Sequence, residues 1–201
     1  MTTPMDLLIV TSEVATDRPV EEGDLSLALA GAELIDLIDA GAVTLDGDRI
    51  VPGPRWTLED RLLDMAESSL DRQAPYESVE DWLWRRGRGL SEAYRAALET
   101  EGQPTRPRHG RLRRRSAPTA SADSPARRHA AERWASGEPV LAGLASAVGV
   151  HDEPAGDFEG PGADTLETVL AAVGDAVTEL AGVRQQRQIE EAAFDNIWRA
   201  P

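Results

Sequence analysis

The sequence contains no cysteine and no long hydrophobic run, and each absence excludes a class of protein. Without cysteine, the chain forms neither a disulfide framework nor a thiolate zinc site, which fits a reducing cytoplasm. No apolar run approaches the roughly 20 residues that a membrane-spanning helix needs. The start MTTPMDLLIV lacks the basic region of a secretory signal. We therefore expect a cytoplasmic protein.

Motifs that carry catalysis are also missing. The sequence has no G-x-S-x-G nucleophile elbow, no phosphate-cradling glycine loop with its lysine and no dinucleotide fingerprint. The three histidines (His109, His129 and His151) lack metal-ligand spacing, and the acids of residues 151–164 lack calcium-loop spacing. We expect no metal, no cofactor and no catalytic activity, and an enzyme of unknown reaction is the least favoured alternative.

Charge is distributed unevenly along the chain. The formal net charge is −15. Residues 85–133 hold 13 arginines against five acids, or +8, and the other residues hold eight arginines against 31 acids, or −23. Such a chain is not expected to coat nucleic acid along its whole surface, but its basic segment could face an anionic surface. The alternative is a basic loop that only offsets nearby acids.

The most hydrophobic stretch is LSLALAGAELIDLIDAGAVTLDGDRIV, residues 25–51. Apolar residues surround most of the helix expected at 25–38, a pattern typical of a buried central helix. Asp24 is the expected N-cap, and Gly41 stands where a left-handed C-cap belongs. The alternating sequence that follows predicts a hairpin that turns at Asp46-Gly47.

A helix followed by a hairpin also resembles a winged-helix DNA-binding domain. Such a domain needs a recognition helix that presents cationic or amide side chains to the major groove. The polar positions of this helix are instead Glu33, Asp36 and Asp39, which phosphates would repel. We therefore expect no nucleic-acid partner.

The rest of the chain predicts further helices. A short apolar run at residues 5–11 fits a strand or a helix. Thr57 is the expected cap of a helix over 57–73, and Ser78 with Asp81 forms a capping box before a helix over 78–87. More helices are expected over 90–102, from Pro125, from 139 and over 165–199. We predict a mainly α protein: a single helical-bundle domain over 1–201 with one or two small β-hairpins, a basic hairpin or loop at 103–123 and a flexible loop at 151–164.

Tryptophans are expected mainly in packing roles. Trp82 and Trp84 lie two apart on one expected helix and therefore face different sides. We expect one of them in the core and the other at an interface. Trp56, Trp134 and Trp198 are expected to be packing residues.

The order of these elements resembles the Golgi phosphoprotein 3 family, including its bacterial members. The resemblance rests on DLLIV, then LSLALAGAELIDLIDAGAVTLDGDRIV, then DRLLDMAESSL and SVEDWLWRRGRGLSEAYRAALETEG, and is best over residues 6–102. The absence of lysine, with much arginine and alanine, is typical of a GC-rich, actinomycete-type genome. The resemblance implies a helical bundle decorated with hairpins and without known catalysis, whose eukaryotic members bind phosphatidylinositol 4-phosphate on membranes.

The lipid site that the resemblance implies is only partly present. Where the family has a Trp and an Arg nine residues later, this chain has Glu21 and Ala30. Of two further family arginines, one matches Arg88 and the other falls on Ser91. Candidate lipid-phosphate ligands are therefore Arg88 with its neighbours Arg85 and Arg86.

Where the family's membrane-touching hairpin carries an apolar tip, this chain has RPRHGRLRRRS. Its six arginines form a candidate patch for an anionic membrane: Arg106, Arg108, Arg111, Arg113, Arg114 and Arg115. A run of like charges is also typical of a solvated loop, and contact of this run with nucleic acid or with an acidic protein partner is a further alternative.

Together these features predict a non-enzymatic adaptor that is peripheral at the inner face of the membrane and contacts anionic lipid or a phosphoinositide headgroup. Protein partners are also expected. The alternative function is a soluble protein–protein scaffold that has lost the lipid site.

Overall fold

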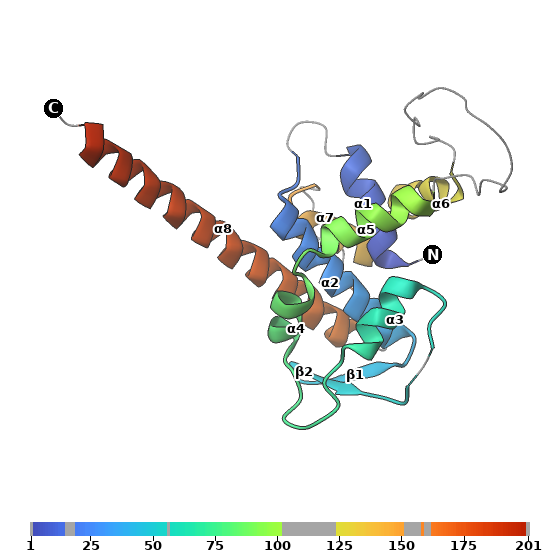
Figure 1. The fold of residues 1–201 in the computed structure, drawn as a ribbon. Helices are drawn as coiled ribbons and strands as arrows, with labels where there is room; N and C mark the ends of the chain where they lie inside the picture. The colour runs from blue at the N-terminus through green and yellow to red at the C-terminus, as the bar shows by residue number, and fades with distance from the viewer. Residues whose placement is uncertain are drawn as a thin grey trace, which may run out of the picture.

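The computed structural model describes residues 2–14, 19–55, 57–101, 124–150, 158 and 162–199. These residues form eight helices and one two-stranded antiparallel hairpin (Figure 1). The elements, in chain order, are α1 (Thr3–Val14), α2 (Glu22–Asp39), β1 (Val43–Asp46), β2 (Arg49–Pro52), α3 (Arg61–Ser68), α4 (Val79–Arg86), α5 (Leu90–Glu101), α6 (Pro125–Ala135), α7 (Pro139–Ala147) and α8 (Ala163–Arg199). The mainly α prediction with a small β-hairpin is confirmed. The apolar run near the N-terminus is a helix.

Helix α2 is the centre of the packing, as its apolar circumference predicts. It contacts α1, α3, α4, α5, α7 and α8, and Figure 1 shows it crossing the middle of the body. Leu29, Leu34, Ile35 and Leu37 have essentially no exposed surface. The prediction of a buried central helix is therefore confirmed.

The start of α2 differs from the prediction. The helix begins at Glu22, two residues before Asp24, and Glu21 at the N-cap position makes no side-chain capping bond. Asp24 lies inside the first turn and accepts hydrogen bonds from Arg184 Nη2 at 2.8 and 2.7 Å. The prediction of Asp24 as the cap is wrong because this carboxylate pairs with an arginine from α8, which is distant in sequence.

The hairpin follows α2 after a left-handed glycine. Gly41 has φ +68°, which confirms its place as the residue that ends the helix. Strands β1 and β2 pair Asp46 with Arg49, so the two-residue loop is Gly47-Asp48, one residue later than expected. Gly47 has φ +62°, the left-handed conformation that such a tight loop requires.

Two further helix starts test the capping predictions. Helix α3 begins at Arg61, later than expected, because the Asp60 side chain rather than Thr57 accepts from the amides of Leu62 and Leu63. At α4 the Ser78 hydroxyl accepts from the Asp81 amide at 3.0 Å and donates to the Asp81 carboxylate at 2.7 Å. The Ser78–Asp81 pairing is confirmed.

The two tryptophans of α4 differ in burial, and the prediction that one of them lies in the core is confirmed. Trp82 has no exposed surface, and its indole Nε1 donates to the Ala30 carbonyl of α2 at 3.0 Å. Trp84 is half-buried and packs against the edge of the core. Trp134 also packs against the core, whereas Trp56 and the side chain of Trp198 lie outside the described part of the structure.

Helix α8 is 37 residues long, and its start and end agree with the expected 165–199 to within two residues. Its first half packs against α2, α4 and α7 through buried Val169, Val173 and Ala176. Figure 1 shows its second half extending away from the bundle. Of the helices in the described ranges, α8 included, none combines the length and the hydropathy that a membrane crossing requires.

Candidate functional site

Three arginines at the end of α4 were expected to hold a lipid phosphate, and the structure gives each a different environment. Arg85 pairs with Glu77 through two hydrogen bonds, Nε to Oε1 at 2.6 Å and Nη2 to Oε2 at 2.7 Å. Its guanidinium carbon also lies 5.2 Å from the centroid of the Trp82 ring, within cation–π range. The pKa of Arg85 is raised mainly by the hydrogen bonds that it donates to Glu77. Its donors therefore already have an acceptor inside the protein.

Arg86 forms the most buried ion pair at this end of the bundle. Its Nε and Nη2 donate to the two carboxylate oxygens of Glu33, at 2.7 and 2.9 Å. Glu33 has no exposed surface, and the Tyr94 hydroxyl donates to its Oε1 at 3.0 Å. Arg86 Nη2 also donates to the Leu62 carbonyl at 3.1 Å. The network links α2, α3, α4 and α5 around one carboxylate.

Burial acts strongly on this network. It raises the pKa of Glu33, against the opposing effects of the Arg86 and Tyr94 hydrogen bonds. Burial also raises the pKa of Tyr94, and the neighbouring Glu33 carboxylate adds to the shift. A carboxyl held in this way fixes the Arg86 guanidinium in place, because a buried charge without its partner is very costly.

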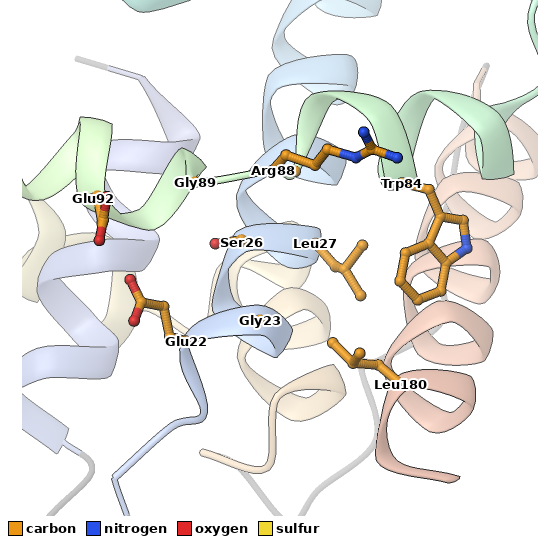
Figure 2. A pocket seen from close by; sticks show the side chains of 10 residues that line it. Glu22, Gly23, Ser26, Leu27, Trp84, Arg88, Gly89, Glu92 and Leu180 are labelled. Carbon is orange, nitrogen blue, oxygen red and sulfur yellow. The ribbon is translucent and has the colours of Figure 1, made fainter. Parts of the chain in front are cut away.

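Arg88 is the member of the trio that faces a hollow. It lies in the short turn between α4 and α5, next to Gly89, whose φ of +68° permits the sharp change of direction. The hollow has a volume of about 380 Å³ and is formed by α2, the α4–α5 turn and α8 (Figure 2). Arg88 is exposed and makes no ion pair with any residue in the described ranges.

The hollow has two chemically different sides. Figure 2 shows Leu27, Trp84 and Leu180 on one side, with Glu22 and Glu92 on the other. Glu22 accepts from the Ser91 hydroxyl at 3.1 Å and from Arg95 Nη1 at 3.5 Å, whereas Glu92 has no partner in the described part of the chain. One free arginine thus lies beside two glutamates and an apolar wall.

The remaining positions matched to the family site supply no further cation. Glu21 is exposed, with a carboxylate oxygen 4.0 Å from Arg184 Nη1. Ala30 is buried in the core, and Ser91 is buried beside Glu22. The structure brings Arg88 and Ser91 to the start of α2, while Ala30 lies within the bundle. Of these matched positions, Arg88 is the one that carries an arginine.

A second polar cluster lies at the start of α1. Buried Asp6 accepts from Arg133 Nη1 at 2.8 Å, and His129 Nε2 lies 3.5 Å from the same carboxylate oxygen. The described residues contain no group of three or more histidines or acids arranged to hold a metal ion. His109, His151 and the six arginines of the predicted membrane patch lie outside the described residues: Arg106, Arg108, Arg111, Arg113, Arg114 and Arg115.

Sequence reasoning missed the buried role of Glu33. It treated Glu33 as one of three polar positions on α2, although it is fully buried. The available signal was its position in a helix that is apolar on nearly all sides, where an acid must find an internal cation. Arg86 lies 53 residues away, so the identity of that cation could not be read from local spacing.

The fold and the site define a helical protein that carries a small hairpin and an arginine-bearing hollow at one end of its central helix. The chain matches the family model of Golgi phosphoprotein 3 (GPP34) over residues 4–190 and belongs to this family. The match extends well beyond residues 6–102, where the sequence resemblance is strongest. No curated protein and no solved structure matches the chain.

Proposed function

We propose that this protein is a non-catalytic adaptor that binds anionic membrane surfaces peripherally, at the cytoplasmic face, through diffuse electrostatic attraction. Membership of the Golgi phosphoprotein 3 family supports the adaptor class. The concentration of arginine between residues 85 and 133, in an otherwise acidic chain, supports an anionic target.

The observation that carries the proposal is the difference among the three arginines of the α4 end. Arg85 and Arg86 each donate two hydrogen bonds to one carboxylate, that of Glu77 and that of Glu33, so their charges are already balanced inside the protein. A phosphate held in a specific geometry needs several cations with free donors. Arg88 alone does not provide them, and Glu22 and Glu92 beside it repel a phosphomonoester.

The densest run of cationic residues in the sequence is the six arginines between residues 106 and 115. Each arginine near an anionic bilayer contributes roughly 1 kcal/mol of attraction. This attraction depends on total surface charge, and salt screens it over about 8 Å at physiological ionic strength. Binding should therefore follow the total anionic lipid.

Co-sedimentation with liposomes tests this proposal. Vesicles containing phosphatidylserine or phosphatidylinositol 4-phosphate are matched for total charge, and salt is varied at constant lipid. We expect equal binding to both compositions and a sharp loss as salt rises. Salt-insensitive binding that is selective for phosphatidylinositol 4-phosphate would contradict diffuse attraction.

Substitutions of arginine test which segment of the chain attracts the membrane. Reversal of Arg113, Arg114 and Arg115 to glutamate should abolish binding, whereas Arg88→Ala should weaken it only partly. A charge-matched control reverses exposed arginines that make no ion pair in the described part of the chain, namely Arg55, Arg61 and Arg128. The control should retain most of the binding, because the proposal assigns the attraction to the 106–115 segment and not to the total charge of the chain.

The second candidate function is a soluble protein–protein scaffold. The acidic side of the hollow favours it, since Glu22 and Glu92 stand where a phosphate-binding protein needs cations. Absence of binding to every anionic vesicle at low salt would exclude the membrane proposal and leave the scaffold.

A further inference from the structure

Helix α6 meets the bundle through charged side chains and few large apolar ones. It packs on α1 and also touches α7. Its buried residues are Ala126 and Ala130, and half-buried Trp134 packs at the margin of the core. Alanine buries little apolar surface, so Trp134 is the one large apolar side chain that α6 adds to the contact.

The two helices in contact carry opposite charges. Residues 125–135 hold three arginines against one glutamate, or +2 with histidine neutral, and residues 3–14 hold two acids and no arginine, or −2. The side chains of α1 that make polar contacts with α6 are those of Thr3, Asp6 and Glu13, whose spacing places them on one face of the helix. This face of α1 is the polar one of a largely apolar helix.

The polar contacts run in antiparallel order along the two helices. Arg127, near the start of α6, pairs with Glu13, near the end of α1. Arg133, near the end of α6, donates from Nη1 to Asp6 Oδ2 at 2.8 Å. His129 Nε2 lies 3.5 Å from the same oxygen. Two arginines of α6 are thus paired with the two acids of α1.

Arg133 also belongs to a contact that does not involve α1. Its Nη2 donates to Glu138 Oε2 at 2.8 Å, and Glu138 accepts from the amides of Val140 and Leu141 at the start of α7. Glu138 lies five residues after Arg133, so this pair is local. The contacts that an opening of α6 breaks are those that cross to α1.

Closure of α6 over α1 leaves a buried carboxylate incompletely paired. The Asp6 side chain has no exposed surface, and its Oδ1 has no hydrogen-bond partner among the described residues. Attraction between buried partners often does little more than offset the loss of their hydration. Opening brings the Asp6 carboxylate and the Arg133 guanidinium back to water, so their pairing adds little net free energy to the closed state.

The ion pair at the other end of the contact lies nearer the solvent. The side chains of Arg127 and Glu13 are 26% and 40% exposed. Ion pairs with this degree of exposure contribute little to stability, and salt weakens them further. Neither end of the contact therefore fastens α6 strongly, as is typical of an element that opens before the rest of a protein.

We propose that α6 opens from α1 as a unit while the rest of the bundle stays folded, and that the acids of α1 mask the α6 arginines in the closed state. In the open state Arg127 and Arg133 join exposed Arg128 as cations available to an anionic surface. The contact is thus autoinhibitory toward the proposed membrane binding, on which this part of the inference rests.

Hydrogen exchange without lipid tests the opening. The full chain is labelled at pH 7, and peptides that cover α6 are compared with peptides that cover α2. We expect the amides of α6 to exchange as one group, at least about a hundredfold faster than those of α2. Exchange of α6 as slow as that of α2 would overturn the proposal.

Glu13→Gln tests the contribution of the charged contact. It removes the acid that pairs with Arg127 and should speed the exchange of α6 by roughly threefold or more, without a change in α2. Glu167→Gln makes the same charge change at an exposed position of α8 and should leave α6 unaffected. Equal effects of the two variants would show that α6 responds to net charge, and masking by α1 would be refuted.

Replacement of the buried ion pair tests the opposite direction. Asp6→Leu combined with Arg133→Leu puts apolar side chains where the charges were, a change that is often neutral or stabilising for buried pairs. The exchange of α6 should then be slower than in the wild type by about threefold or more. Circular dichroism checks that the helix content is retained. Faster exchange in the folded double variant would show that the charges fasten α6, contrary to the proposal.

Vesicles containing phosphatidylserine separate this inference from the proposed function. At low salt Glu13→Gln should bind about twofold more tightly than Glu167→Gln, because both raise the net charge by one but only the first frees Arg127. Equal binding of the two would refute masking. If none of the proteins binds while α6 exchanges as expected without lipid, the membrane proposal fails and the opening of α6 stands.

Discussion

Helices α2 and α8 are the two longest helices of the structure, and they meet the rest of the protein in opposite ways. α2 is enclosed along nearly its whole length, with Leu25 through Ile35 buried on every side. α8 is buried along one stripe and only over its first half. A helix that is apolar on nearly all sides is therefore predicted to be buried. A helix with a single apolar stripe is predicted to pack against something, but the stripe does not identify the partner.

Polar residues on the two helices follow the same contrast. On α2, Glu33 pairs with Arg86, and the Asp36 carboxylate accepts from the Thr3 amide at 2.9 Å. On the outer part of α8, Arg187 and Glu191 have no such partner among the described residues. Charged side chains on a buried helix need hydrogen-bond or ion-pair partners within the fold. Charged side chains on an exposed helix are hydrated and remain available to another molecule.

The largest effect should come from removing the cation that α2 requires. Arg86→Ala leaves the fully buried Glu33 carboxylate without its guanidinium, which should cost about 3–5 kcal/mol of unfolding free energy. Urea denaturation monitored by tryptophan fluorescence measures the loss. Arg85→Ala is the matched control, since its pair with Glu77 is partly exposed and should contribute less than about 1 kcal/mol. Equal losses would show that the Glu33 pair is not special.

The next effect tests the apolar enclosure of α2. Leu34→Ala should cost about 2–5 kcal/mol, because the lost methyl groups leave a cavity among neighbours that cannot fully relax. The midpoint and slope of urea denaturation give the value. Met65→Ala is the control, because Met65 is 47% exposed and its change should stay near 0.5 kcal/mol. A midpoint unaltered by Leu34→Ala would contradict the central role of α2.

The sequence was sufficient where local pattern alone decides the structure. The apolar circumference around Leu34 identified the core helix, Gly41 its end, and Ser78 with Asp81 the start of α4. Each depends on residues within a few positions of one another, so spacing carries the information. The family resemblance was also correct, although it was strongest over only half the chain.

The candidate site could be predicted less well because its pairings join distant segments. Asp24 is of a residue type that often caps helices, but its partner is Arg184, 160 residues away. Arg86 looked equivalent to Arg88 in the sequence, yet Glu33 removes one of them from the surface. Competition between a local and a distant partner is decided by the tertiary fold, which spacing does not reveal.

A third prediction concerns the acid at the end of α2. Burial raises the pKa of Asp36 to about 6, against the Thr3 hydrogen bonds and Arg133, while Asp39 adds to the shift. A raised pKa means that the folded state binds a proton more tightly than the unfolded state. As the pH falls from 6 to 4, protonation of this residue should therefore raise the free energy of unfolding. Above pH 6 the buried charge should lower the free energy of unfolding.

Asp36→Asn isolates this effect because its side-chain oxygen can still accept from the Thr3 amide. The variant should be more stable than the wild type at pH 7, by an amount on the order of 2 kcal/mol. The difference should shrink toward zero at pH 4, where the wild type is protonated. Thermal denaturation of both proteins across this range measures it. A difference that stays constant with pH would show that Asp36 does not titrate there.

The smallest effect is expected at Ile189 on α8, and it sharpens the contrast with α2. Ile189 is 56% exposed and lies nine residues after Leu180, which at 3.6 residues per turn places it on the opposite side of the helix from the stripe. Ile189→Gln should therefore change the unfolding free energy by no more than about 0.5 kcal/mol, because little apolar surface is lost from the fold. Urea denaturation of the variant and the wild type measures this change. A loss above about 1 kcal/mol would show that Ile189 packs against the body, and the contrast between the outer part of α8 and the enclosed α2 would then fail.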